Sequence, residues 1–273
     1  MSRIDQPSTG PQPEAPASLL RRLAPLIVIG ALMALVFAMG WHKHLSFKTI
    51  GLNYEALKGF VADNLVLALA AYMALYVAVI ALSLPGGLVM TLSGGLLFGW
   101  LAGAIATVVA ATIGATIIFL VARTSLGEGL AARAGPWVSK LADGFKENAL
   151  SYLLFLRLVP AFPFFVVNLV PALLGVPLTT YVLGTFVGII PGTTAFSVLG
   201  AGLGSAVESQ NAIYNECLAK QGARGPERCT YSIDTKSLVT TELLAAFVLL
   251  GVVALIPVAI KRLKARSAGD AKA

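Results

Sequence analysis

Long uninterrupted apolar runs dominate the middle of the chain. No Asp, Glu, Lys, Arg or His occurs between Leu65 and Ala122, and none occurs between Leu158 and Val207. A helix that crosses the ~30 Å hydrocarbon core of a bilayer needs about 20 residues, so each of these stretches must hold more than one membrane element. The pattern therefore predicts an all-α polytopic membrane protein.

The alternation of apolar and polar runs divides the chain into five parts. They are a disordered Pro-rich arm (1–18), an anchor helix with an interfacial amphipathic segment (19–63), a membrane core (64–203), a polar loop with both cysteines (204–242), and a last membrane helix with a basic tail (243–273). The first apolar run also has a small-residue pair before Trp41, as a cleavable signal would, but its length favours a retained anchor.

Gly and Pro break the membrane core at two places. Leu65–Ser83 has the length of a spanning helix, whereas 85–99 is too short to cross at 1.5 Å per residue and is expected to form a re-entrant hairpin. The second broken stretch, 150–176, is expected to form another. Its interruptions are Arg157, Pro160, Pro163, Asn168, Pro171 and Gly175.

A longer apolar run follows each broken stretch, at 100–122 and at 178–203. The second run is expected to break at Pro191–Gly192, because proline removes a helix hydrogen bond. Between the two runs, the polar stretch 123–148 carries apolar residues at roughly helical spacing, which predicts a helix on the membrane surface.

The two halves of the core share an order of features. Pro85 precedes Gly99 by 14 positions, and Pro160 precedes Gly175 by 15. Broken segments in corresponding places of two halves point to a transporter-type site where the halves meet. The sequence therefore predicts a pseudo-repeat with two re-entrant hairpins.

Charge is scarce and lies at the edges of the apolar runs. Charged residues make up 12% of the chain, where a soluble domain has about a quarter. The net charge is +7, but no basic face interleaved with aromatic residues is present, so the basic residues are expected to meet lipid and not nucleic acid.

Arg157 is the sharpest candidate for a binding residue. An Arg within a membrane segment costs at least ~2.5 kcal/mol, and no acidic residue lies between Leu154 and Pro171. Its guanidinium must reach water, backbone carbonyls or an anion such as a phosphate, which it can bind through two oxygens. The alternative is that Arg157 extends along the membrane to the interface.

Other polar residues near Arg157 are weaker candidates. Pro160 and Pro163 leave carbonyls unsatisfied, which favours a polar cavity at this depth. Asn168 is expected either to donate into that cavity or to tie the hairpin arms together. Arg123 is expected to contribute to substrate binding, to neutralise the carbonyls at its helix end, or to anchor the helix at the interface.

No pattern of an enzyme is present. The chain lacks a Ser/His/Asp set, paired carboxylates in an apolar segment and a phosphate-binding Gly-Lys motif. His42 and His44 are the only histidines, which makes a metal site improbable. We therefore expect no catalytic residue, no metal and no cofactor.

Cys217 and Cys229 are candidates for a disulfide, provided that their loop is extracytoplasmic. From Gly204 to Glu242 there are four basic and five acidic residues, against five basic and one acidic after Ile260. The positive-inside rule then places the tail in the cytoplasm and the cysteines outside. Five predicted spans, however, would place the tail outside, and the sequence leaves this conflict open.

Two motif series follow one another in the membrane core. The first is Gly94, Phe98, Gly99, Gly103, Gly114, Phe119 and Arg123, with Pro85 and Gly95 as further structural candidates; the second is Phe155, Arg157, Pro160, Pro163, Asn168, Gly175, Tyr181, Gly184, Thr185, Gly188 and Pro191. In these series the chain resembles the DedA superfamily, more closely its VTT-domain branch of SNARE-associated Golgi proteins. The resemblance implies two hairpins that enter from opposite faces and an association with moving lipids or polyprenyl-phosphate carriers between leaflets.

One departure from the family affects the expected energy source. DedA proteins proper carry an acidic residue in the first hairpin, where this chain has Pro85-Gly86-Gly87, and no carboxylate occurs between Asp63 and Glu128. Proton coupling through a buried acid is therefore not expected, whereas downhill scrambling needs none.

The expected function is a lipid scramblase or flippase-type transporter of the bacterial plasma membrane. Its expected partners are membrane lipids with anionic or phosphate-bearing headgroups, and a homo-oligomer is compatible with the sequence. The alternative is a membrane organising or assembly factor that does not transport and that recruits partners through the helix at 123–148.

Overall fold

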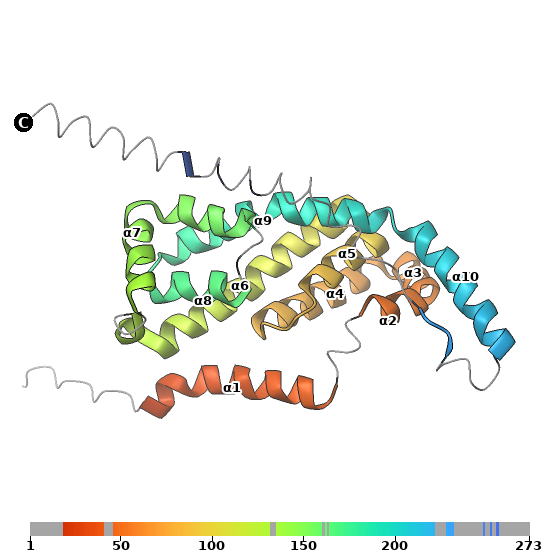
Figure 1. Cartoon of the computed structure of the whole chain (residues 1–273), viewed down its shortest axis with the longest axis horizontal. Coiled ribbons are helices and arrows are strands. Elements are labelled where there is room, and N and C mark those ends of the chain that lie inside the picture. Colours follow the sequence, from red (N-terminus) through yellow and green to blue (C-terminus); the bar gives the residue numbers. More distant parts are fainter. Residues whose placement is uncertain are drawn as a thin grey trace, which may run out of the picture.

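The computed structural model describes residues 19–40, 46–131, 135–159, 162, 164–221 and 228–231, and four single positions after residue 247. Within these ranges the secondary structure is helical, without strands, which confirms the all-α prediction (Figure 1). The helices are α1 (Leu19–Ala38), α2 (Phe47–Leu52), α3 (Tyr54–Asp63), α4 (Leu65–Ala81), α5 (Gly87–Phe98), α6 (Trp100–Ala131), α7 (Gly135–Leu158), α8 (Phe164–Leu173), α9 (Leu178–Ala201) and α10 (Gly204–Gln221).

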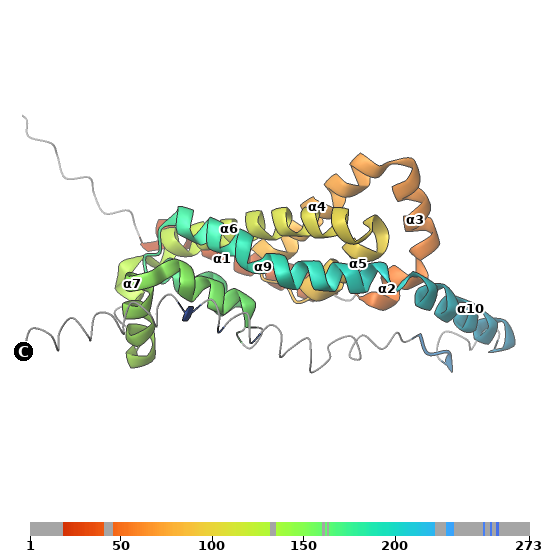
Figure 2. The ribbon, with the colours of Figure 1, turned by 90° about the horizontal axis from the view of Figure 1, so that it is seen from above.

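Two long helices, α6 and α9, run side by side along the length of the molecule (Figures 1 and 2). Within the described residues, Trp100–Thr124 of α6 and Leu178–Ala201 of α9 are the segments long and apolar enough to cross a membrane. The expected break at Pro191–Gly192 is wrong, because Pro191 lies inside the continuous helix α9. A proline is tolerated in such a helix where neighbouring groups satisfy the freed carbonyl.

The first broken stretch folds differently from the expected hairpin at 85–99. Its residues form one continuous helix, α5, which follows α4 after a tight turn and packs on α6 and α9. Glycine does not break α5 at Gly94 and Gly95, because these positions lie where other groups approach closely. A Cβ on Gly94 would meet the Tyr72 hydroxyl, and one on Gly95 would meet the carbonyl of Ser197.

A glycine with positive φ precedes each long helix. Gly99, with φ 78°, lies between α5 and α6, and Gly175, with φ 72°, lies shortly before α9. No heavy atom would crowd a Cβ at either position, so the left-handed backbone itself calls for glycine. Gly99 joins α5 to α6, on which α5 packs, and Gly175 leads from α8 toward α9, while α8 itself packs on α6.

The polar stretch between the halves is not one surface helix. Helix α6 continues to Ala131, and α7 begins at Gly135 and bends at Asn148, whose φ of −149° and ψ of 62° are not helical. The first part of α7 projects from the body in Figure 2, and its second part packs on α9. Helix α8 then packs on α6, so the second half also contributes to both long helices.

The expected polar loop at 204–242 begins as a helix. Residues 205–221 contain neither Gly nor Pro, and Glu216 forms an i,i+4 ion pair with Lys220 at 2.7 Å, which favours helix. Cys217 of this helix, α10, is joined to Cys229 by a disulfide bond. The arm at 1–18, residues 232–242, most of the last apolar run and the tail lie outside the described residues.

Helix α10 is held against the segment that precedes α4. Asn211 donates to the carbonyl of Gly51 at 2.9 Å, and Lys58 pairs with Glu208 at 3.2 Å. The ring of Tyr231 lies so close to Gly51 that a Cβ there would clash with it. Helices α2, α3 and α10 and residues 228–231 therefore form one cap at the end of the bundle.

Candidate functional site

Arg157 lies in the last turn of α7 and is the centre of a polar network in the bundle. Its Nη2 donates to the Oδ1 of Asn168, the hydroxyl of Tyr181 and the Oγ1 of Thr185, each at 2.9 Å. The guanidinium carbon also lies 5.5 Å from the centre of the Tyr181 ring. All three acceptors are neutral oxygens, so the network binds the cation without supplying a negative charge.

Three helices bring these side chains together. Asn168 belongs to α8, and Tyr181 and Thr185 lie one turn apart on α9. Gly188, one turn further along α9, lets α7 come close, because a Cβ there would lie 2.8 Å from the Cβ of Arg157. A glycine on α9 is therefore what allows the arginine to reach its acceptors.

Helix α6 fixes the ring that receives Arg157. The ring of Tyr181 stacks on Phe119 with 4.1 Å between centroids and 22° between planes. Its hydroxyl lies 2.9 Å from the Oδ1 of Asn168 and 3.3 Å from the carbonyl of Ala115, either of which can take its proton. Tyr181 and Asn168 have no exposed surface. The acceptors are therefore positioned before any ligand arrives.

The network contains hydrogen-bond donors without acceptors. The Nε of Arg157 and the Nδ2 of Asn168 are buried, and neither has a partner among the described residues. The ion pairs of the described chain, Lys58–Glu208 and Lys220–Glu216, do not involve Arg157. Buried donors and an uncompensated positive charge together form an environment that an anion would complete.

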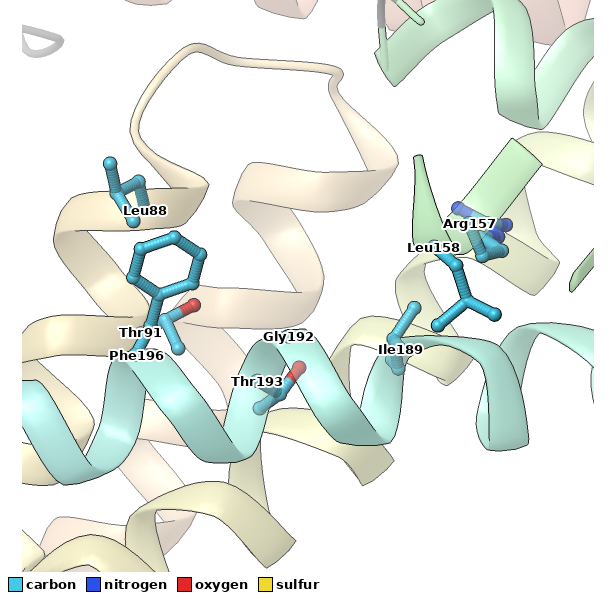
Figure 3. A pocket seen from close by; sticks show the side chains of 8 residues that line it. All are labelled: Leu88, Thr91, Arg157, Leu158, Ile189, Gly192, Thr193 and Phe196. Carbon is cyan, nitrogen blue, oxygen red and sulfur yellow. The ribbon is translucent and has the colours of Figure 1, made fainter. Parts of the chain in front are cut away.

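A cavity of about 260 Å³ lies beside this network (Figure 3). Its walls come from the start of α5, the end of α7 and the middle of α9, so both halves of the core line it. The lining is apolar apart from two threonines and the arginine. The lining residues are Leu88, Thr91, Arg157, Leu158, Ile189, Gly192, Thr193 and Phe196.

The structure brings together two of the five predicted binding residues, Arg157 and Asn168. Arg123 is exposed and lies eight residues beyond Ala115 on α6, about 12 Å along the helix axis, so it does not join the network. Pro160 and Pro163 lie outside the described residues. The Oδ1 of Asn168 links α7, α8 and α9, while its Nδ2 has no partner among the described residues and Asn168 does not line the cavity, so its donation into the cavity stays a prediction.

Tyr181 and Thr185 are site residues that sequence reasoning did not assign. Both belong to the motif series, but neither was expected to bind anything. The available signal was their i,i+4 spacing, which places two hydroxyls on one face of an otherwise apolar helix. This spacing identifies one side of the helix, but it does not predict which charged group lies against that side.

The remaining motif residues have packing roles. A Cβ on Gly103 would meet the backbone of Gly94, one on Gly114 would lie 2.7 Å from Ile80, and one on Gly184 would lie 2.7 Å from a methyl of Leu153. Phe98 packs on the ring of Tyr72 at 5.3 Å, and Pro85 lies in the turn between α4 and α5. These residues let the short helices lie against the long ones.

Comparison with known proteins identifies the part of the chain that carries this arrangement. A family model for the VTT domain matches residues 84–202. The chain is 33% identical to Transmembrane protein 41 homolog of Dictyostelium discoideum over 171 residues, which covers 59% of this chain and 50% of that protein. It is 29% identical to Transmembrane protein 41B of Danio rerio and 27% identical to that of Homo sapiens, each over 146 residues and 49% of this chain.

These matches cover part of each protein. They span 51% of the Danio rerio protein and 50% of the human one, so the chain spans about half the length of the curated relatives it matches. No solved structure matches the chain.

Two apolar helices of spanning length and relatives that are named transmembrane proteins support an α-helical integral membrane protein. Residues 84–202 match the VTT domain, and the relatives that the chain resembles belong to the VTT/DedA family. The resemblance seen in the two motif series is thereby confirmed.

Proposed function

We propose that this protein moves phosphate-bearing lipids, phospholipids or polyprenyl phosphates, between the leaflets of the bacterial plasma membrane. One observation carries the proposal: Arg157 is positioned beside a cavity in the bundle, and its hydrogen-bond acceptors are all neutral. A positive charge without a counter-ion attracts an anion into a site that otherwise disfavours charge. A lipid phosphate supplies that anion while its hydrocarbon tail remains in the bilayer.

The proposal places α6 and α9 along the membrane normal. Helices α4 and α5 then enter from one end of the molecule, and the second part of α7 and α8 enter from the other, as re-entrant hairpins (Figure 1). At 1.5 Å per residue α4 and α5 extend for about 25 and 18 Å, less than the ~30 Å core. The cavity, lined by residues from both hairpins, supports this view because it lies at their ends.

The helix contacts support a pseudo-repeat. Helix α4 packs on α6 as α7 packs on α9, and α5 packs on α9 as α8 packs on α6. Helices α5 and α8 therefore each contact the long helix of the other half. These crossed contacts place the cavity where the two halves meet, which is where transporters built from repeats hold their substrates.

Assigning α4 to a hairpin removes the conflict over sidedness. The crossing segments are then α1, α6, α9 and the predicted last span at 243–260, an even number that returns the tail to the side of the N-terminus. The tail is cytoplasmic by its charge, and Cys217 and Cys229 are extracytoplasmic, where a disulfide is stable. Charge and disulfide thus favour the same orientation.

In the proposed mechanism, a lipid phosphate replaces neutral acceptors of the guanidinium. Arg157 can turn two N–H groups toward phosphate oxygens, and the free Nδ2 of Asn168 can add a further donor. Tyr181 and Thr185 take the guanidinium back when the lipid leaves. No acidic residue is needed in this cycle, so the movement runs down the lipid gradient.

The test is lipid translocation by the purified protein in liposomes. A fluorescent phospholipid, bleached from the outside by dithionite, reports how fast the inner leaflet empties. Arg157→Ala should slow translocation by roughly tenfold or more, because a hydrogen bond to a charged group is worth ~1.5–3 kcal/mol and 1.4 kcal/mol is a factor of ten. A parallel experiment with a polyprenyl phosphate distinguishes the two lipid classes.

The matched control is Arg123→Ala, which removes an exposed arginine from the same domain. Its rate should stay within about twofold of the parent rate, since exposed charges contribute little. Equal rates for the parent and Arg157→Ala proteins would remove Arg157 from the mechanism. Absence of translocation by the parent protein for both lipid classes would overturn the proposed function.

A second candidate is a membrane organising factor. The projection of the first part of α7 from the bundle favours it, because a helix held away from the body can meet a partner (Figure 2). Deleting residues 135–147 should then abolish recovery of a defined partner with the purified protein. If the parent protein recovers such a partner and moves no lipid, this candidate replaces the first.

A further inference from the structure

A second cavity, of about 310 Å³, lies between α3, α4 and α5 and shares no lining residue with the cavity at Arg157. We call it the α3–α4 groove. In Figure 2, α3 and α4 diverge from the short connection that joins them. Leu75 and Phe60, on opposite walls, are 48% and 44% exposed, so the groove is open to the surroundings.

The wall formed by α3 is the apolar side of an amphipathic helix. Leu57, Phe60 and Val61 line the groove and follow the i, i+3, i+4 spacing of one helix face. On another side of α3, Lys58 pairs with Glu208 of α10 within the cap. This contact helps to hold α3 with its apolar side toward the groove, and no residue of α10 lines the groove.

The polar groups on the floor of the groove are already bonded within the protein. The hydroxyl of Tyr72 lies 2.6 Å from the Oγ1 of Thr107 and 3.0 Å from the carbonyl of Met90, and Ser93 donates to the carbonyl of Val89 at 2.6 Å. An acceptor on a ligand would therefore find no free donor on this floor. Such a surface favours a pure hydrocarbon occupant, because burying an unpaired polar group is unfavourable.

We propose that the α3–α4 groove holds one acyl chain of a membrane phospholipid. The groove opens at Leu75 of α4, which is 48% exposed, and in an integral membrane protein such an apolar opening meets acyl chains. Phospholipid chains are the most abundant hydrocarbon there, so mass action favours them over other apolar ligands. The site rests on the membrane class of the protein and does not depend on transport at Arg157.

Photolabelling in liposomes tests this assignment. The vesicles contain phosphatidylcholine and phosphatidylglycerol, with a small fraction of phosphatidylcholine that carries a diazirine on one acyl chain. After irradiation, mass spectrometry measures the label on each peptide. We expect strong labelling of the α3 peptide with Phe60, and labelling of the lipid-facing side of α6 at Ile105 serves as the internal reference.

Two substitutions fill the groove from opposite walls, and each has a neighbour as its control. Ala71→Trp on α4 and Val61→Trp on α3 place an indole in the groove and should reduce α3 labelling to background while Ile105 stays labelled. Ala74→Trp and Ala62→Trp change exposed positions outside the groove and should leave the labelling unchanged. Retained reference labelling shows that a variant is folded.

The outcomes separate this inference from the proposed function. Unchanged α3 labelling in both filled variants overturns the groove site, as does a cross-link from α3 to the chain's own segment 243–260. Stronger labelling of α3 by a polyprenyl phosphate with the same diazirine overturns the choice of phospholipid. None of these results changes the translocation rate expected for Arg157→Ala, and failure of translocation leaves the labelling expectation intact.

Discussion

The two halves of the membrane core pack in the same way, but the side chains at the matching contact differ in charge. In each half a glycine on the long helix receives a side chain from an earlier helix, α4 in the first half and α7 in the second. A Cβ on Gly114 would lie 2.7 Å from Ile80, and one on Gly188 would lie 2.8 Å from Arg157. Ile80 completes an apolar contact, whereas Arg157 introduces a cation at the matching place.

The hydrogen bonds of the two halves differ accordingly. In the first half, Tyr72 bonds with Thr107 at 2.6 Å and Tyr76 bonds with Thr91 at 3.0 Å, so neutral hydroxyls satisfy one another. In the second half, neutral oxygens surround a guanidinium, and two buried donors are left without a partner. The same backbone arrangement can therefore hold an inert interior or a charged one, and the charged one is where a ligand is expected.

The largest effect is expected from exchanging the two side chains. Ile80→Arg introduces a charge at a buried position within an apolar cluster, which should cost about 3–5 kcal/mol and lower the yield of folded protein. The reciprocal change, Arg157→Ile, should fold and resist heating as well as the parent, but move no lipid. Size-exclusion yield and the midpoint of thermal aggregation in detergent measure the difference.

This exchange is also the most direct way to break the comparison. If Ile80→Arg folds normally and retains activity, the first half tolerates charge as the second does. The neutral acceptors around Arg157 would then have no special role.

A smaller effect, on the rate of translocation and not on folding, is expected when an internal counter-ion is introduced beside Arg157. Asn168→Asp keeps the shape of the side chain and places a carboxylate about where the Oδ1 lies now, 2.9 Å from the Nη2 of Arg157. The protein should remain folded, and translocation of anionic lipids should fall by roughly tenfold, because the carboxylate competes with the phosphate for a bond of ~1.5–3 kcal/mol.

The matching change outside the network is Asn53→Asp, at an exposed amide that bonds to a neighbouring carbonyl. It should leave the rate of translocation unchanged. An Asn168→Asp protein that transports at the parent rate would mean that the charge of Arg157 need not be left open for a ligand.

A third pair of variants compares equal chemistry in the two halves. Thr185→Val removes one acceptor of a cation and should cost about 1.5–3 kcal/mol, whereas Thr107→Val removes a neutral hydrogen bond and should cost ~0.5–1.5 kcal/mol. The thermal midpoints should rank in that order, and only Thr185→Val should slow translocation. Equal losses of stability in the two variants would contradict the difference between the halves.

The smallest effect on transport is expected outside both halves. Replacing Cys217 and Cys229 by Ser removes the link that closes the cap, so peptides of α10 should exchange amide hydrogen faster. The membrane helices share no disulfide with the cap, and translocation should remain within about twofold of the parent rate. A large loss of transport would show that the cap acts on the core.

Some features of the fold were predictable because one side chain or one run decides them. Charge-free apolar runs predicted membrane helices, and the motif series identified the family. Gly99 and Gly175 held corresponding places in the two broken stretches, and both adopt positive φ. Arg157 was singled out because a charge in an apolar stretch needs a reason wherever its partners lie.

Other features depended on contacts between distant parts of the chain. Gly94 and Gly95 were expected to break a helix, yet they lie inside α5, because Tyr72 and the backbone of Ser197 occupy the space that a Cβ would need. The acceptors of Arg157 lie 11, 24 and 28 residues further along the chain. No local pattern predicts that α8 and α9 present them to the same guanidinium.

The sequence by itself determined that the core of this protein lies in a membrane, that its fold is helical, and that Arg157 needs a partner within an apolar segment. These features depend on composition over short windows, because that composition decides where charge and apolar surface can be buried. Only the tertiary structure decided how the cation is held, since hydrogen bonds form between groups that helix packing brings within 3 Å. That packing left Arg157 with neutral acceptors beside a cavity, and so left its charge available.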